Sequence, residues 1–229
     1  MSMNKNFNAS YKTLSVFGPQ IGLVKLNDYV VKEMLEITDQ ILIDKERTSS
    51  GYQLAGQIKE ESKIDLKLLE EGGLDKFFDQ VLASHVKYVL KDWGHVNQEI
   101  STLITEMWMV SQYENEYNPV HWHEGCTLSC TLYLKIPEYE QRNIPNKNNR
   151  DGQICLINGN PSSPFVSLEN PLVTFDPKVG DMYVFPSRML HCVYPFQGTG
   201  ERRSVAFNAY HQVQNDPRLF HQDHEKDKQ

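Results

Sequence analysis

The 229-residue sequence contains no apolar run close to the roughly 20 residues that a membrane-spanning helix requires. Its first segment, Met1–Ala9, is polar and rich in asparagine, and it has no apolar stretch of the kind that marks a secretory signal. The mean hydropathy of the chain is negative, at −0.53. We therefore expect a cytoplasmic protein without a membrane partner.

Cysteine is scarce, and basic charge is scattered. None of the four cysteines forms a Cys-x-x-Cys pair, so we expect free thiols in a reducing compartment and no zinc knuckle.

The chain has 23 Lys and Arg against 30 Asp and Glu, a net charge of −7 at pH 7. A nucleic-acid-binding surface needs a basic stripe, and the nearest thing to a cluster is Arg202-Arg203. We expect no nucleic-acid partner.

What the sequence does contain begins with helical patterns in residues 1–98. Apolar residues recur at helical spacing over 26–43, with Asn27 or Asp28 as a plausible N-cap. A second helical stretch over 66–90 is interrupted by Gly72-Gly73 and resumes as a long amphipathic helix. We therefore predict a helical N-terminal part.

Residues 99–213 change to a period of two, which is typical of half-buried strands. The predicted strands are 107–113, 126–136, 154–157, 172–175, 182–185, 191–194 and 203–210. Many short strands with Gly, Pro and Asn turns indicate a jelly roll. Helices followed by strands predict a single α+β domain, with the helices packed on one sheet. We expect residues 1–12 to be loosely held and residues 214–229 to form a flexible tail.

Three histidines form the candidate metal site. In a strand, residues i and i+2 point to the same side, so His121 and His123 can direct two imidazoles at one point. The third ligand must come from elsewhere, and His191 is the best candidate because it starts a strand after a Pro-containing turn. Neutral imidazoles suit Fe, Zn, Cu or Ni.

An arginine follows on a later strand. Alternation places Arg202 on one face with Ser204, Ala206 and Asn208, while Arg203 faces the opposite way. An inward Arg202 can bind a carboxylate through two parallel hydrogen bonds, and Ser204 can add a third. The alternative interpretation is a salt-bridging pair on the surface at the start of a strand.

This arrangement resembles the iron(II)- and 2-oxoglutarate-dependent oxygenases, whose fold is a double-stranded β-helix. It is most similar to the prolyl-4-hydroxylase-like branch and to uncharacterised bacterial and phage oxygenases. If a phage encodes the chain, its compartment would be the host cytosol. The matching stretches are 112–123, 128–134, 180–191 and 202–208.

The resemblance implies a dioxygenase, a hydroxylase that uses Fe(II), 2-oxoglutarate and O2 and releases succinate and CO2. Its substrate would be a peptidyl side chain or a small molecule. His121 and His191 would bind iron, and Arg202 with Ser204 would anchor the far carboxylate of 2-oxoglutarate. Tyr113 and Asn118 would contact the co-substrate.

One departure from the family pattern leaves alternatives open. The usual carboxylate ligand is replaced by His123, and Glu124 could supply a carboxylate only if the backbone turns after His123. A cupin-type three-histidine dioxygenase is one alternative, although Thr127 and Leu128 stand where its glutamate belongs. A zinc enzyme and a non-catalytic jelly-roll interaction protein are the others. The sequence determines neither the substrate nor the oligomeric state.

Overall fold

The structure is a computed structural model that describes residues 9–14, 19–51, 54–92, 99–140, 148–159 and 171–214. A seven-stranded antiparallel sheet has the order β1-β2-β10-β6-β13-β4-β3. Its strands are β1 (Ala9–Leu14), β2 (Ile21–Leu26), β10 (Asp181–Pro186), β6 (Leu128–Lys135), β13 (Arg202–Val213), β4 (Ile100–Gln112) and β3 (Glu60–Lys63).

A four-stranded antiparallel sheet faces the large one, in the order β5-β11-β8-β9. It consists of β5 (Asn118–His121), β11 (Leu190–Val193), β8 (Ile154–Ile157) and β9 (Leu172–Phe175). A small pair is formed by β7 (Glu138–Tyr139) and β12 (Gly198–Thr199). The two facing sheets form the predicted jelly roll, which is confirmed.

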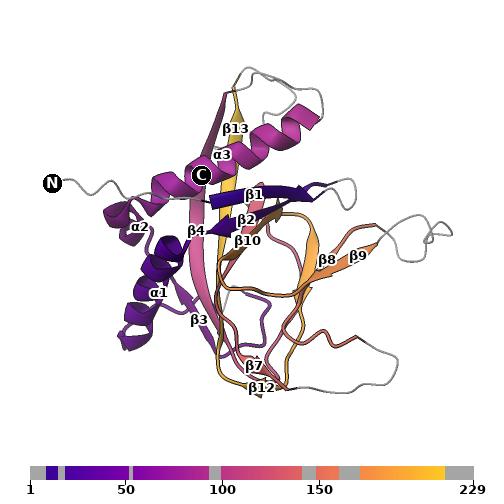
Figure 1. The fold of residues 1–229 in the computed structure, drawn as a ribbon. Helices are drawn as coiled ribbons and strands as arrows, with labels where there is room; N and C mark the ends of the chain where they lie inside the picture. Colours follow the sequence, from indigo (N-terminus) through magenta and orange to yellow (C-terminus); the bar gives the residue numbers. More distant parts are fainter. Residues whose placement is uncertain are drawn as a thin grey trace, which may run out of the picture.

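Three helices, α1 (Asp28–Ile43), α2 (Lys67–Gly72) and α3 (Leu74–Asp92), lie on the other side of the large sheet from β8 and β9 (Figure 1). The Asn27 side chain caps α1 by accepting the Val30 N–H at 2.9 Å, as predicted. Gly73 ends α2 with φ 70°, a conformation that favours glycine. No helix in the described part of the chain is long and apolar enough to cross a membrane.

Each face of the large sheet packs against a different hydrophobic core. On the helix side, Phe78 of α3 packs against Phe207 of β13, with ring centroids 5.3 Å apart. This core includes Met34 of α1 and Val205 of β13. A second core lies between the two sheets and contains Tyr133, Leu156 and Phe185, among others. The helices thus cover the outer face and leave the inner face of the large sheet for a cavity.

The N-terminal part is less purely helical than predicted, because β1, β2 and β3 also lie within residues 1–98. Residues 9–12, predicted to be loosely held, belong to β1, and residues 60–63, between the two predicted helical stretches, form β3. Both are edge strands of the sheet, and β3 is entirely polar, so their place depends on main-chain pairing that a hydrophobic pattern does not record. Of the predicted flexible tail, residues 215–229 lie outside the described residues.

Candidate metal centre

The structure brings the three predicted histidines together. His121 at the end of β5 lies directly opposite His191 of β11. His123 follows two residues later, where its backbone N–H donates to the Ser187 carbonyl at 2.9 Å. Each side chain offers one nitrogen, and these three atoms lie within 4.8 Å of one another, so the cluster can hold a metal ion. Because β5 and β11 belong to the small sheet, the cluster stands opposite the inner face of the large one.

Hydrogen bonds orient all three rings in the same way. The Nδ1 atom of His121 lies 2.7 Å from the Pro119 carbonyl oxygen, and that of His191 lies 2.9 Å from the Met189 carbonyl oxygen. The Nδ1 atom of His123 lies 2.6 Å from the side-chain oxygen of Asn208. A carbonyl oxygen can only accept, so each Nδ1 carries the proton and each Nε2 keeps a lone pair. Protein metal sites commonly hold their histidine ligands by such contacts.

Burial keeps these imidazoles neutral. Loss of water lowers the pKa of His121 and of His123 below the ordinary value of 6.5. Burial, together with the neighbouring His121, lowers the pKa of His191 to about 3. Since only the unprotonated nitrogen can bind a metal, the cluster is in its binding form at neutral pH.

Arg202 is buried at the start of β13, where it is 2% exposed. Its Nε donates to the Gly152 carbonyl at 3.1 Å, and its Nη1 donates to the Ser204 hydroxyl at 3.4 Å. Its guanidinium lies 4.9 Å from the centre of the Tyr133 ring. Within the described ranges no carboxylate pairs with Arg202. A buried cation without a counter-charge is costly, so this position favours an anionic ligand.

Two tyrosine hydroxyls lie near the same arginine. The hydroxyls of Tyr133 and Tyr139 are buried and have no hydrogen-bond partner in the part of the chain that the structure describes. Burial raises the pKa of both phenols, to about 12 for Tyr139, so each hydroxyl keeps its proton for donation. A ligand carboxylate could accept hydrogen bonds from these buried hydroxyls and form an ion pair with the arginine.

The other predicted site residues divide into two groups. Ser204 and Asn118 line the same inner cavity as the histidines and Arg202. Tyr113 does not line it, because β4 ends one residue earlier and the chain turns; this side chain is 49% exposed. Glu124 is not part of the histidine cluster, since its exposed carboxylate lies 3.3 Å from Arg188 at the surface. Sequence reasoning missed Tyr133, although the alternation along β6 puts it on the face of Thr131.

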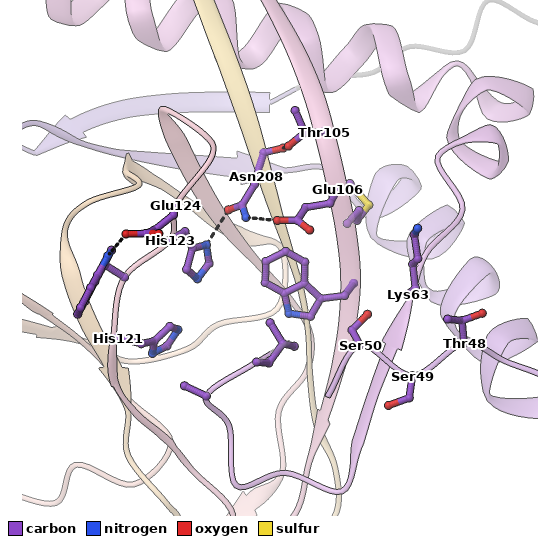
Figure 2. A pocket seen from close by; sticks show the side chains of 15 residues that line it. Thr48, Ser49, Ser50, Lys63, Thr105, Glu106, His121, His123, Glu124 and Asn208 are labelled. Carbon is purple, nitrogen blue, oxygen red and sulfur yellow. Dashed lines mark hydrogen bonds between the residues drawn. The ribbon is translucent and has the colours of Figure 1, made fainter. Parts of the chain in front are cut away.

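On the inner face of the large sheet, residues that lie opposite one another on neighbouring strands form rows across the strands. One row joins Glu106, Asn208 and Ser129, and it lies beside His123. The next joins Lys63, Trp108, Ala206 and Thr131, and a third joins Glu61, Val110, Ser204 and Tyr133. The wide cavity of about 750 Å³ opens over the first two rows and is bounded by Thr48, Ser49 and Ser50 (Figure 2).

Residues 106–208 match the family described as "Putative 2OG-Fe(II) oxygenase". A prolyl hydroxylase from Trichoplax adhaerens, solved with a peptide fragment of the hypoxia inducible factor oxygen degradation domain, is 17% identical over 83% of each chain, with a TM-score of 0.50. The non-heme alpha ketoglutarate dependent epimerase SnoN from nogalamycin biosynthesis is 16% identical, covering 82% of this chain and 76% of its own, with a TM-score of 0.54.

AviO1 from Streptomyces viridochromogenes Tue57 is 11% identical, covering 88% of this chain and 92% of its own, with a TM-score of 0.50. At such identities these three likenesses show the fold alone. No curated protein matches the chain in sequence. The matched family segment runs from β4 into β13 and contains the three histidines and Arg202.

Proposed function

We propose that the chain, whose residues 106–208 match the family described as "Putative 2OG-Fe(II) oxygenase", is an iron(II)- and 2-oxoglutarate-dependent dioxygenase that hydroxylates a peptidyl side chain or a small molecule. The observation that carries the proposal is the buried, unpaired Arg202 in the cavity of the three histidines. When bound, iron(II), 2-oxoglutarate and O2 supply oxidative decarboxylation to succinate and CO2, coupled to oxidation of a substrate C–H bond.

His121, His123 and His191 would hold the iron through their Nε2 atoms. The donor set fits, because imidazole nitrogen is a common ligand for iron and all three rings are neutral and oriented. The third histidine takes the place of a carboxylate. Glu106 accepts a hydrogen bond from the Asn208 amide, whose oxygen in turn contacts His123. This series of hydrogen bonds makes His123 a stronger metal ligand than an isolated imidazole would be.

Arg202 would bind the far carboxylate of 2-oxoglutarate. Ser204 and the hydroxyls of Tyr133 and Tyr139 would add hydrogen bonds, and Asn118 would line the space between. The Gly152 carbonyl holds the guanidinium in place before the ligand arrives. Such preorganised donors lose little entropy on binding. Tyr113 is not proposed for this role, because its ring lies outside the cavity.

Apolar side chains of the second core exclude water from the site. The ring of Phe185 lies against that of His191, with centroids 5.0 Å apart. Ile154 and Val193 close the same wall and are both buried. A dry wall protects a reactive centre from side reactions with solvent.

Anaerobic titration tests the proposal. We expect the apo-protein with iron(II) and 2-oxoglutarate to develop a visible metal-to-ligand charge-transfer band. In Arg202→Met the 2-oxoglutarate concentration at half-saturation should rise by about thirtyfold or more, as expected when a buried charge loses its partner. Arg188→Met is the matched control, because that arginine is exposed and lines neither cavity.

Two results would contradict the proposal. One is an unchanged half-saturation in Arg202→Met. The other is tight iron binding without any band in the unaltered protein. The second result would favour a cupin-type dioxygenase or a zinc enzyme that does not use 2-oxoglutarate.

A further inference from the structure

The inner cavity is also lined by Glu61, an acidic residue without a role in the proposed binding of iron or 2-oxoglutarate. Glu61 lies on the edge strand β3, opposite Val110 of β4, and its side chain points to the inner face. The residue is only 3% exposed, and its Oε2 atom is buried with no hydrogen-bond partner among the residues that the structure describes. Buried carboxyl groups without a partner are rare because they are costly. This one therefore requires an explanation.

A glycine brings the surrounding loop close to this acid. A Cβ atom at Gly56 would collide with a side-chain oxygen of Glu61 and with one of Asn118. Glycine thus lets the loop 54–58 close over both polar groups. The loop is held at Gln57, whose backbone N–H donates to the Tyr117 carbonyl at 2.8 Å. Leu54 and Ala55 of this loop line both the wide cavity and the inner one.

The cavity has different charges on its two sides. Arg202 and Tyr133 lie at the β13–β6 side, where 2-oxoglutarate is proposed to bind. Glu61 lies at the β3 side, and Glu106 stands on the neighbouring strand β4. Trp108 lines both cavities and lies between these two acids along the inner face of the sheet. The only basic side chain from β3 on this face is Lys63, which is exposed and lines the wide cavity (Figure 2).

We propose that Glu61 determines substrate specificity by binding a positively charged group, an ammonium or guanidinium, of the compound that this site oxidises. This inference rests on the proposed oxygenase function. A cation would satisfy the free Glu61 oxygen and would lie in the cavity that Trp108 also lines, where an aromatic ring can attract positive charge. Burial, with Glu116 nearby, raises the pKa of Glu61 to about 7, because these surroundings disfavour a negative charge. A bound cation would stabilise the carboxylate.

Two pairs of probes, each with one charged and one neutral member, test the proposal. Nα-acetyl-lysine methylamide carries an ammonium, whereas Nα-acetyl-norleucine methylamide lacks it, and n-butylammonium against n-butanol gives the same comparison for a small molecule. Binding of each to the full chain is measured by ligand-observed NMR, without iron or 2-oxoglutarate. We expect at least one charged probe to bind about tenfold more tightly than its neutral match. The pair that shows the preference tells whether a peptidyl or a small basic group is taken.

The variant Glu61→Gln keeps the shape of the side chain and removes its charge. It should reduce the preference for the charged probe to less than about threefold, whereas Glu71→Gln, an exposed glutamate on α2, should leave it unchanged. Equal affinity of the charged and neutral probes in the unaltered protein would overturn the proposal without any variant. A preference that survives Glu61→Gln would overturn it as well.

The same assay separates this inference from the proposed function. Arg202→Met should abolish tight 2-oxoglutarate binding but retain the preference for the charged probe, because Arg202 lies on β13 and Glu61 on β3. If 2-oxoglutarate fails to bind while the preference persists, the oxygenase proposal fails and Glu61 remains a cation site. If 2-oxoglutarate binds and no preference is found, only the cation site fails.

Discussion

Single side chains prepare the metal site before any ion arrives. Each of the three histidines has its Nδ1 atom against an oxygen, and only for His123 is that oxygen on a side chain, Asn208. The Ser129 hydroxyl, 2.9 Å from the same Nδ1 atom, is the other side chain there. The orientation of His123 can therefore be altered by mutation without touching a ligand, whereas the other two rings are held by the backbone.

We expect Asn208→Ala to weaken iron(II) binding by about 10- to 100-fold, as losses of such supporting hydrogen bonds generally do. The physical reason is that the Nδ1 atom of His123 loses the amide oxygen of Asn208 and keeps only the Ser129 hydroxyl beside it. Titration of the apo-protein with iron(II) under anaerobic conditions measures the change. Asn158→Ala is a suitable control, because Asn158 follows β8 and lines neither cavity. Equal affinities of the two variants would show that Asn208 does not position His123.

Glu61 should make stability depend on pH in a direction that is unusual for an acid. Its pKa is raised from 4.5 to about 7 by burial and by Glu116, so the folded chain holds a proton between these values that the unfolded chain has released. Stability contributed by this group is therefore complete below pH 4.5 and is lost as the pH rises through 7. The loss amounts to at most about 3 kcal/mol.

The measurement is the free energy of unfolding in urea at pH 5 and pH 8. In Glu61→Gln the decrease between these two values should be smaller than in the unaltered protein, and the variant should be the more stable of the two at pH 8. Glu71→Gln controls for the charge change at an exposed position. Parallel pH dependence in all three proteins would mean that Glu61 is ionised and solvated in the folded state.

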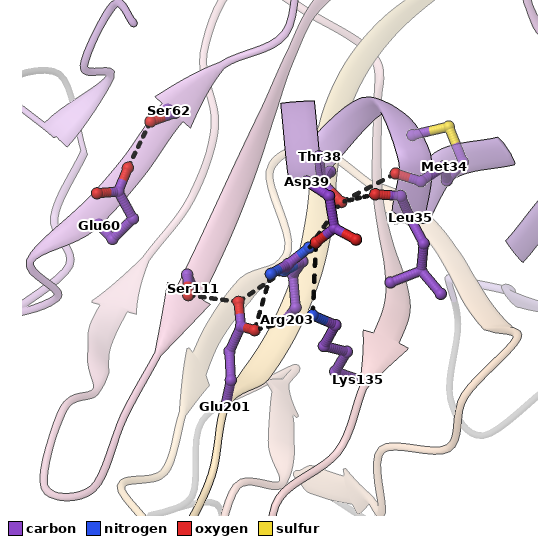
Figure 3. A network of polar contacts seen from close by, with 10 residues as sticks. All are labelled: Met34, Leu35, Thr38, Asp39, Glu60, Ser62, Ser111, Lys135, Glu201 and Arg203. Carbon is purple, nitrogen blue, oxygen red and sulfur yellow. Dashed lines mark hydrogen bonds and ion pairs between the residues drawn. The ribbon is translucent and has the colours of Figure 1, made fainter. Parts of the chain in front are cut away.

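At the scale of elements, Arg203 ties helix α1 to the large sheet (Figure 3). Its guanidinium donates to Thr38 at 3.1 Å, pairs with Asp39 of α1, and donates to both oxygens of Glu201 at 2.6 and 2.8 Å. Glu201 also accepts from Ser111 at 2.6 Å. The salt-bridging interpretation considered for the Arg202-Arg203 pair thus describes Arg203, which is buried rather than on the surface.

Removing this charge should loosen the helix without changing the site. We expect Arg203→Met to lower the free energy of unfolding by about 3 kcal/mol, because the largely buried Glu201 carboxylate loses its buried partner and keeps only the more exposed Lys135 as a counter-charge. Urea unfolding measures the loss. The affinity of the folded variant for 2-oxoglutarate should match that of the unaltered protein, in contrast to Arg202→Met. A weakened affinity in Arg203→Met would show that the two faces of β13 are coupled.

At the scale of the whole molecule, the layering decides where chemistry can occur. The helices occupy one face of the large sheet, and the small sheet faces the other, so the cavity that the histidines and Arg202 line lies between the sheets (Figure 1). Strands from distant parts of the chain meet there, with β3 and β13 on either side of β4. Co-substrate and substrate are thereby proposed to bind in one cavity, the first beside β13 and the second beside β3.

Local sequence determined much of this protein. The helical period and the Asn27 cap fixed α1, because a helix is stabilised by neighbours along the chain. Strand alternation placed Arg202 and Ser204 on one face and Arg203 on the other. The predicted pairing of His121 with His123 also holds, although β5 ends at His121 and His123 lies just beyond the strand. These are properties of three to four consecutive residues, which a sequence displays directly.

Only the tertiary structure decided which distant residues meet. The pairing of β5 with β11 sets His191 against His121, and the pairing of β6 with β13 brings Tyr133 to Arg202. The polar strand β3 delivers Glu61 to the same cavity through its antiparallel pairing with β4. Backbone groups are alike in every residue, so the choice of a partner strand depends on the packing of the whole sheet and leaves no local pattern.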